Sequence, residues 1–228
     1  MPPRAIFAEE DRHFPLQVNA HGCCNRARSS EDEVIGQLIS LLHGRVPDRY
    51  RDRLTVEIRQ GSDYDHELGV FTGLNIEAVI RRWLMGFHAA LYRAPLPPDT
   101  RFATQAPFPS GSIENESVVI HEVPPQHRLF VEVLKRNRMA DSLDTIVCNN
   151  GKLRYECVWV RMDDEGWGCI YGLDLYGWKD LGDIHNFEPR GCAGLYRTKD
   201  AQCPIGATTA TRLDFTFRNE DTLDPFAS

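Results

Sequence analysis

The stretch "TIVCNNGKLRYECVWV", residues 145–160, decides the fold of the second half of this 228-residue chain. Its Asn150-Gly151 pair separates two runs that are rich in β-branched, aromatic and apolar residues. Such a pair is the strongest short signal for a β-hairpin, because both residues tolerate the left-handed backbone that tight turns require. We therefore predict antiparallel strands over 145–148 and 153–160.

The segments around this hairpin favour further strands. Residues 167–175 follow an Asp-Glu-Gly turn, and five apolar or aromatic side chains alternate along them: Trp167, Cys169, Tyr171, Leu173 and Leu175. A period of two places these side chains on one face of a strand. Strands are also predicted at 14–18, 118–121, 129–133 and 213–217. The second half then forms an antiparallel meander.

Two helices are predicted ahead of this sheet. Ser30 and Glu33 form a capping box at the start of a helix that ends near residue 43. Apolar residues recur at helical spacing over 76–91, with Asn75 as the cap. This second helix must end near Arg93, because the residue after it precedes a proline.

These patterns together predict an α+β protein. A short N-terminal knuckle-like segment and two main helices precede a C-terminal antiparallel β-sheet. The segment 94–113 contains five prolines and no periodicity, which is typical of a connector. The expected division is therefore a knuckle-like and helical part (1–93), a connector (94–113) and a β domain (114–228).

Composition restricts the classes of function. The formal net charge is −7, which argues against broad adhesion to nucleic acid but leaves room for a local basic site. No window reaches the roughly 18 apolar residues of a membrane span, and the N-terminus lacks the apolar core of a signal peptide. The seven cysteines have irregular spacing, unlike a secreted disulfide framework. A cytoplasmic protein with reduced thiols, away from membranes, is expected.

The stretch "HGCCNRARSSEDE", residues 21–33, concentrates metal-compatible side chains. His21 and Cys24 have the H-x-x-C separation of a zinc knuckle, in which two ligands converge across a tight turn. A structural zinc needs four ligands, and no second C-x-x-C or H-x-x-C pair occurs in the chain. The alternative is a polar turn that leads into a capped helix. The residues alone leave both interpretations open.

The order of motifs resembles a bacterial HNH-type endonuclease-like family. The resemblance rests on "PPRAIF" at 2–7, on the stretch 21–33, and on the helix end "FHAALYRAPLP" at 87–97. The family carries paired prolines, then a C-x-x-C-N stretch followed by serine and acidic residues. Here His21 and Cys24 stand at the two cysteine positions and Asn25 at the asparagine. The resemblance covers about 33 residues and that helix.

The resemblance implies zinc bound through His21 and Cys24, with Asn25 orienting groups in the catalytic centre. Among the acidic residues 31–33, Asp32 is the expected ligand of a catalytic Mg²⁺. The macrodipole offers another explanation, since carboxylates are favoured in the first turn of a helix whether or not a metal binds.

The implied activity is metal-dependent hydrolysis of phosphodiester bonds in DNA, with an expected defect. The family's leading histidine, the general base that activates water, would stand just before residue 1, and its other cysteine pair further upstream. Loss of a general base costs about 10²- to 10⁴-fold in rate. A truncated or degenerate nuclease is therefore expected. The alternative is a non-catalytic scaffold that binds a protein partner through its acidic surface, in an oligomeric state that the sequence leaves open.

Four histidines outside this motif have structural interpretations. His88 lies at the edge of an apolar helical face, where a hydrogen-bonded core position is expected. His121 and His127 flank two prolines, which predicts a strand end and a turn. His185 lies in a polar loop of the kind that is normally solvated.

Overall fold

The computed structural model describes residues 6–7, 9–13, 29–42, 57–60, 67–70, 75–104, 111–114, 117–120, 125–162, 166–175, 191–197 and 202–210. The chain divides into two compact units. The first unit comprises residues 1–83 and 109–122, and the second comprises 84–108 and 123–228. One helix, α4 (Ile76–Tyr92), crosses the boundary, so that its two halves belong to different units.

The first unit contains helices and two small hairpins. Its described elements are η2 (Glu9–Asp11), α2 (Ser29–Leu42), β1 (Glu57–Gln60), β2 (Glu67–Val70), the first half of α4, β4 (Gly111–Glu114) and β5 (Ser117–Ile120). Strand β1 pairs with β2, and β4 pairs with β5, both antiparallel. The cap predicted for α4 is confirmed, because the amide of Ala78 donates to Oδ1 of Asn75 over 2.9 Å.

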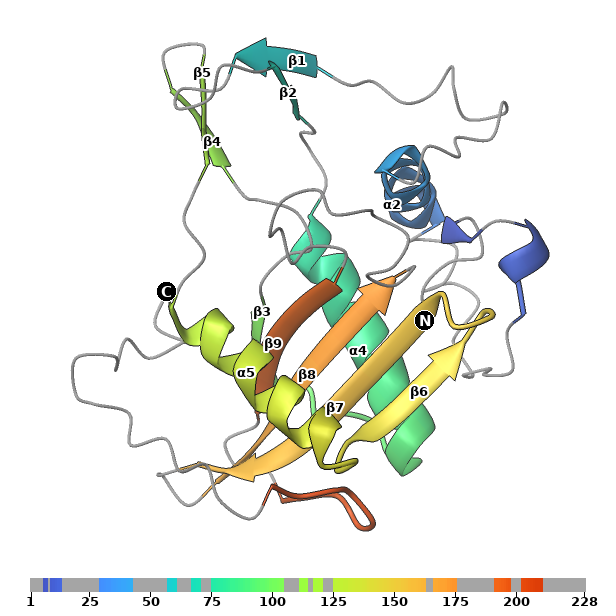
Figure 1. The fold of residues 1–228 in the computed structure, drawn as a ribbon, viewed down its shortest axis with the longest axis vertical. Helices are drawn as coiled ribbons and strands as arrows, with labels where there is room; N and C mark the ends of the chain where they lie inside the picture. The colour runs from blue at the N-terminus through green and yellow to red at the C-terminus, as the bar shows by residue number, and fades with distance from the viewer. Residues whose placement is uncertain are drawn as a thin grey trace. The chain divides into compact units, whose positions relative to one another are not determined.

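The second unit is built on a five-stranded antiparallel sheet in the order β3-β9-β8-β7-β6 (Figure 1). Its elements after α4 are β3 (Arg101–Thr104), α5 (Pro125–Met139), β6 (Asp144–Cys148), β7 (Leu153–Arg161), β8 (Trp167–Leu175) and β9 (Gly191–Arg197). The chain runs through β6, β7 and β8 as a meander, and β9 follows at the far side of β8. Strand β3 pairs with β9 and forms one edge of the sheet.

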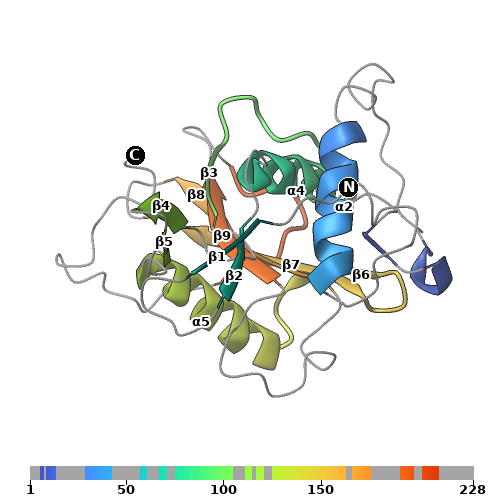
Figure 2. The ribbon, with the colours of Figure 1, turned by 90° about the horizontal axis from the view of Figure 1, so that it is seen from above.

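Both faces of this sheet are covered by helices. Figure 2 shows α5 on one side of the strands and the C-terminal half of α4 on the other. On the α5 face, Phe130, Val133 and Leu134 follow helical spacing and pack in one core with apolar residues of the strands: Ala103, Val158, Val160, Ile170, Ala193 and Leu195. On the α4 face, the ring of Phe87 stacks on Tyr155 with centroids 4.7 Å apart. Strand β7 is therefore buried from both sides.

The β6–β7 hairpin turns through a run of left-handed residues. Asn149, Asn150 and Gly151 have φ values of 55°, 54° and 79°. The amide of Gly151 donates to the carbonyl of Cys148, and Lys152 donates to Asn149. Asparagine and glycine are the residues that take this conformation at the lowest cost, which explains why the pair signalled the hairpin.

A distant segment covers the edge of β7 beyond the end of β6. The amide of Trp159 donates to the carbonyl of Thr208 over 3.0 Å, and the amide of Ala210 donates back to Trp159 over 3.0 Å. Trp159 thus forms an isolated parallel bridge with Thr209. Residues 208–210 therefore satisfy the backbone at a point that β6 does not reach.

The predicted α+β class with an antiparallel sheet is confirmed. The strands expected over 145–148, 153–160 and 167–175 correspond to β6, β7 and β8, and both predicted helices are present as α2 and α4. The strands expected at 14–18 and 213–217 lie outside the described residues. Within the described part of the chain, no helix is both long and apolar enough to cross a membrane.

The structure differs from the local predictions at three places. Residues 129–133 belong to helix α5, so His127 lies in a helix rather than in a turn. Strand β3 lies inside the segment for which an irregular connector was expected. Strand β9 was not predicted. In α5, Phe130, Val133 and Leu134 are the residues buried against the sheet, and their spacing is helical. The other apolar residues at 129–133 hid this spacing in the sequence.

Gly194 in β9 provides a test of the packing. A Cβ atom at this position would lie 2.2 Å from the carbonyl oxygen of Ala103 and 2.6 Å from the hydroxyl of Tyr171. The obstacle is largely backbone, which cannot move aside without breaking the β3–β9 pairing. We expect Gly194→Ala to lower the free energy of unfolding by about 2 kcal/mol or more, measured by chemical denaturation. Gly172→Ala is the matched control, since the atom nearest to its Cβ would be the tip of the Leu134 side chain, at 3.0 Å, and the next is Cγ of Glu156, at 3.6 Å. Equal effects of the two substitutions would contradict this packing.

Candidate functional site

Of the four residues that the sequence places in a metal-dependent centre, one lies in the described part of the chain. His21, Cys24 and Asn25 fall outside it. Asp32 lies in the first turn of α2, where the sequence predicted it. Its carboxylate forms an ion pair with Arg82 of α4, through Oδ1 and Nη2. The side chains of Asp32 and Arg82 are 20% and 30% exposed.

The electrostatics of Asp32 are those of a half-buried, paired carboxylate. Burial raises its pKa above the usual range, and the charge and hydrogen bond of Arg82 act in the opposite direction. The negative charge of neighbouring Glu31 adds a smaller upward contribution. With Oδ1 engaged by an arginine, the described environment of Asp32 suits a structural ion pair better than a cation site. In the residues that the structure describes, no group of three His, Cys, Asp or Glu side chains has the geometry of a metal site.

A larger polar constellation lies in the second unit, between the C-terminal half of α4 and the sheet. We call it the tyrosine cluster, and it comprises Tyr92, Tyr155, Tyr171, Tyr196, His88, Trp159, Cys157, Cys169 and Asp144. Alternation along β7 and β8 directs Tyr155, Cys157, Cys169 and Tyr171 to the α4 face of the sheet. All four of these side chains are 0% exposed.

One end of the tyrosine cluster is organised by Asp144, the first residue of β6. Its Oδ2 accepts a hydrogen bond of 2.7 Å from the hydroxyl of Tyr92 and one of 2.8 Å from the amide of Thr208. Its Oδ1 accepts from the hydroxyl of Thr208 over 2.7 Å. The indole of Trp159 donates to the oxygen of Tyr92 over 3.1 Å. One carboxylate thus ties α4, β6 and residues 202–210 together.

The thiol of Cys157 completes this end. Its sulfur lies 3.3 Å from the hydroxyl oxygen of Tyr92. Because the single proton of that hydroxyl is directed at Asp144, the thiol is the donor in this contact. The tyrosine oxygen therefore accepts from two groups and donates to a third, which leaves no polar atom of Tyr92 unsatisfied.

The other end of the tyrosine cluster contains His88. It is 4% exposed, and its Nδ1 lies 3.1 Å from the hydroxyl of Tyr196. Tyr196 in turn approaches the hydroxyl of Tyr155 at 3.5 Å. Burial lowers the pKa of His88 to about 4, so the imidazole is neutral at pH 7. The hydrogen-bonded core position predicted for His88 is confirmed.

The tyrosine cluster binds protons tightly and excludes solvent. Burial raises the pKa of Tyr92, Tyr155 and Tyr196 above the ordinary tyrosine range, and it also raises the pKa of Cys169. Phenols and thiols in this state are protonated at pH 7 and are poor nucleophiles. The arrangement serves to bond the helix to the sheet rather than to carry out nucleophilic chemistry.

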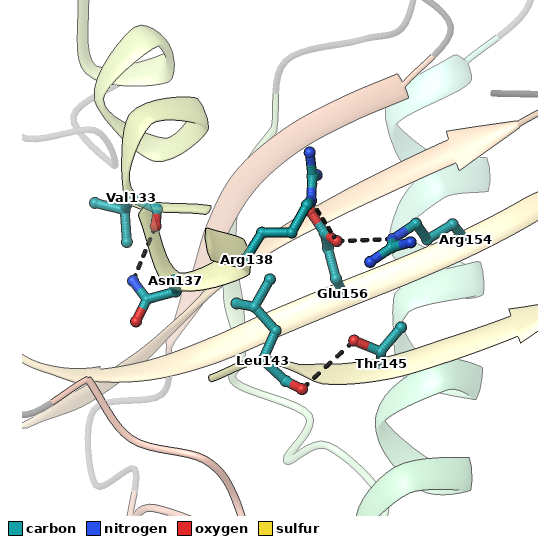
Figure 3. Close-up of polar contacts among 7 residues, drawn as sticks. All are labelled: Val133, Asn137, Arg138, Leu143, Thr145, Arg154 and Glu156. Atoms are coloured by element: carbon teal, nitrogen blue, oxygen red, sulfur yellow. Dashed lines mark hydrogen bonds and ion pairs between the residues drawn. The ribbon is translucent and has the colours of Figure 1, made fainter. Parts of the chain in front are cut away.

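A third constellation lies on the opposite, α5 face of the sheet. Glu156 of β7 is only 2% exposed, so its carboxylate is buried in the protein. Arg138, at the end of α5, binds both of its oxygens, and Arg154 donates from Nε to Oε2 over 2.9 Å. Figure 3 shows the two arginines reaching this carboxylate from different elements. We call these three residues the arginine clamp.

Sequence reasoning missed the arginine clamp. A glutamate between tyrosine and cysteine in an otherwise buried strand was the available signal, because a buried carboxylate is rare unless it is paired. Its partners were not predictable locally, since Arg138 belongs to a helix that the sequence pattern mistook for a strand.

The chain was compared with protein-family models, with curated proteins and with solved structures, and none of these comparisons gives a match.

The buried neutral state of His88 predicts a pH dependence of stability. The folded pKa of about 4 lies below the ordinary value of 6.5. As the pH falls, His88 is therefore protonated in the unfolded chain before it is protonated in the folded one. The free energy of unfolding decreases between pH 6.5 and pH 4 as a result. This contribution reaches about 3 kcal/mol. We expect His88→Asn, which retains a polar partner for Tyr196, to flatten the curve of unfolding free energy against pH in this window. An unchanged curve would contradict the neutral, buried imidazole.

The ion pair between Asp32 and Arg82 predicts coupling between two positions. Asp32→Asn and Arg82→Gln should each lower the free energy of unfolding by about 1 kcal/mol, because the pair is only partly buried. The double variant should cost less than the sum of the two, as measured by a double-mutant cycle in denaturant. Strict additivity would show that the two side chains do not interact.

Proposed function

We propose that this chain is an HNH-endonuclease-like protein, directed at the phosphodiester bonds of DNA. The observation that carries the proposal is the motif at 21–33 and its position before a helix. That motif ends in α2, which begins at Ser29 with acidic residues in its first turn. The family pattern places its serine and acidic residues in the same order.

The proposal assigns roles to the motif residues. His21 and Cys24 are the zinc ligands, and Asn25 orients groups next to them. Zinc held in this way fixes a turn, since two ligands separated by two residues converge on one ion. The role of magnesium ligand stays a proposal for Asp32, whose Oδ1 is paired with Arg82. The proposal assigns no hydrolytic step to these residues.

The second candidate is a non-catalytic protein that binds a protein partner. Two observations favour it. The net charge of −7 opposes general attraction to DNA. The pairing of Asp32 with Arg82 also gives the acidic turn of α2 a structural purpose that needs no metal.

We also propose a cytoplasmic location. Cys148, Cys157, Cys169 and Cys203 are free thiols. Cys157 and Cys169 are fully buried. Free thiols are typical of a reducing compartment.

Zinc content tests the proposal. Because His21 and Cys24 supply only two of the four ligands of a structural zinc, the purified full chain should contain less than one zinc per molecule by elemental mass spectrometry, and Cys24→Ser should lose most of it. Cys203→Ser is the matched control, because Cys203 is a partly buried free thiol outside the motif. Nicking of supercoiled DNA in Mg²⁺ is measured in parallel.

The outcomes separate the two candidates. Zinc that depends on Cys24 but not on Cys203 supports the endonuclease-like assignment even if nicking is undetectable. A chain that folds without zinc and does not bind DNA at low salt contradicts it, and favours the protein-binding alternative.

A further inference from the structure

The arginine clamp leaves hydrogen-bond donors that point away from its carboxylate. An arginine has five N–H donors in a planar fork. Arg138 uses Nε and Nη2 on Glu156, whereas Arg154 uses only Nε. Among the described residues, none accepts a hydrogen bond from the two terminal nitrogens of Arg154. That terminal pair is the part of the fork that matches two oxygens of a phosphate.

The two arginine side chains are partly exposed, and each is held at one end by Glu156. The side chain of Arg154 is 42% exposed and that of Arg138 is 44% exposed, while Glu156 beneath them is only 3% exposed. A buried carboxylate thus holds Arg138 through Nε and Nη2 and Arg154 through Nε (Figure 3). Because the guanidinium groups are already held by Glu156, the arginine side chains lose less conformational entropy when an anion binds.

Two features near the clamp would repel an anion: the end of α5 and the carboxylate of Asp174. The nearby end of α5 would repel an anion through its carbonyl groups, but the chain itself satisfies several of them. The side-chain amide of Asn137 donates to the carbonyl of Val133, and the backbone amide of Ser142 donates to the carbonyl of Asn137. Asp174 lies opposite Arg154 on β8, and its charge raises the pKa of Arg138 after the larger effect of Glu156.

The charges of the clamp set the expected strength of binding. Two arginines face two carboxylates, Glu156 and Asp174, so that attraction at long range is weak. Selectivity must then come from the planar geometry of the fork rather than from net charge. Such a site binds at low salt and weakens as salt rises.

We propose that the arginine clamp binds a backbone phosphate of a nucleic acid, through the terminal nitrogens of Arg154 and the outer edge of Arg138. The choice of nucleic acid among phosphate compounds rests on the proposed function. The contact with a phosphate is inferred separately, from the terminal nitrogens of Arg154 and the outer edge of Arg138. The clamp belongs to the second unit and shares no residue with the motif at 21–33.

The test is binding of the full chain to a fluorescent DNA duplex at several salt concentrations, followed by anisotropy. Arg154→Gln should weaken binding about tenfold at low salt, and it should reduce the slope of log affinity against log salt by about 0.9. Arg161→Gln is the matched control, because Arg161 is an exposed arginine on the same strand. It should leave the slope unchanged. Arg154→Lys, which keeps the charge but not the fork, should fall between Arg154→Gln and the wild type. Thermal unfolding of each variant verifies that it folds.

Three results would overturn the proposal. The first is equal loss of affinity in Arg154→Gln and Arg161→Gln, which indicates a general charge effect. The second is a wild-type chain that does not bind the duplex at low salt. The third is binding of a mononucleotide as tightly as the duplex, which assigns the clamp to a small phosphate compound. A wild-type chain that does not bind the duplex also counts against the endonuclease-like function. Equal effects of Arg154→Gln and Arg161→Gln overturn the clamp alone, because zinc content, which tests the motif at 21–33, is not a readout here.

Discussion

The burial of β7 from both sides is the constraint on which the second unit depends. Residues 155–160 are all buried, so successive side chains must satisfy two different environments. On the α5 side, Val158 and Val160 require only apolar neighbours and receive them from α5. On the α4 side, Tyr155, Cys157 and Trp159 carry polar atoms, and each of these needs a partner in a region without solvent. Where β7 presents Glu156 to the α5 side, two arginines are required to compensate the buried charge.

This division gives the two faces different properties. Packing on the α5 face is mainly apolar and non-directional, and it tolerates small shifts of the helix. On the α4 face, Asp144, Tyr92 and Thr208 are joined by directional hydrogen bonds, which fix the rotation and position of the second half of α4. The tyrosine cluster therefore specifies one arrangement, whereas the apolar core supplies most of the stabilisation.

The sequence predicted the elements that depend only on residues close to one another in the chain. The Asn150-Gly151 turn and the alternation along β8 depend on neighbouring residues, and the cap at Asn75 needs only the next turn of helix. Helix α5 was mistaken for a strand because Leu129 to Val133 form a mixed apolar run whose helical face is visible only once the sheet is in place. Asp32 was correctly identified as a notable carboxylate, but its partner lies 50 residues away, and no local pattern indicates Arg82.

The pairing of Trp159 with residues 208–210 has a consequence for synthesis of the chain. A bare strand edge is a template for association with other chains. The hairpin of β6 and β7 can form as soon as residue 161 is available, but the backbone of Trp159 is covered only when Ala210 has been made. During that interval the edge is exposed on a strand with apolar side chains on both faces. Nascent chains at this stage, rather than the finished protein, are the species most prone to aggregate.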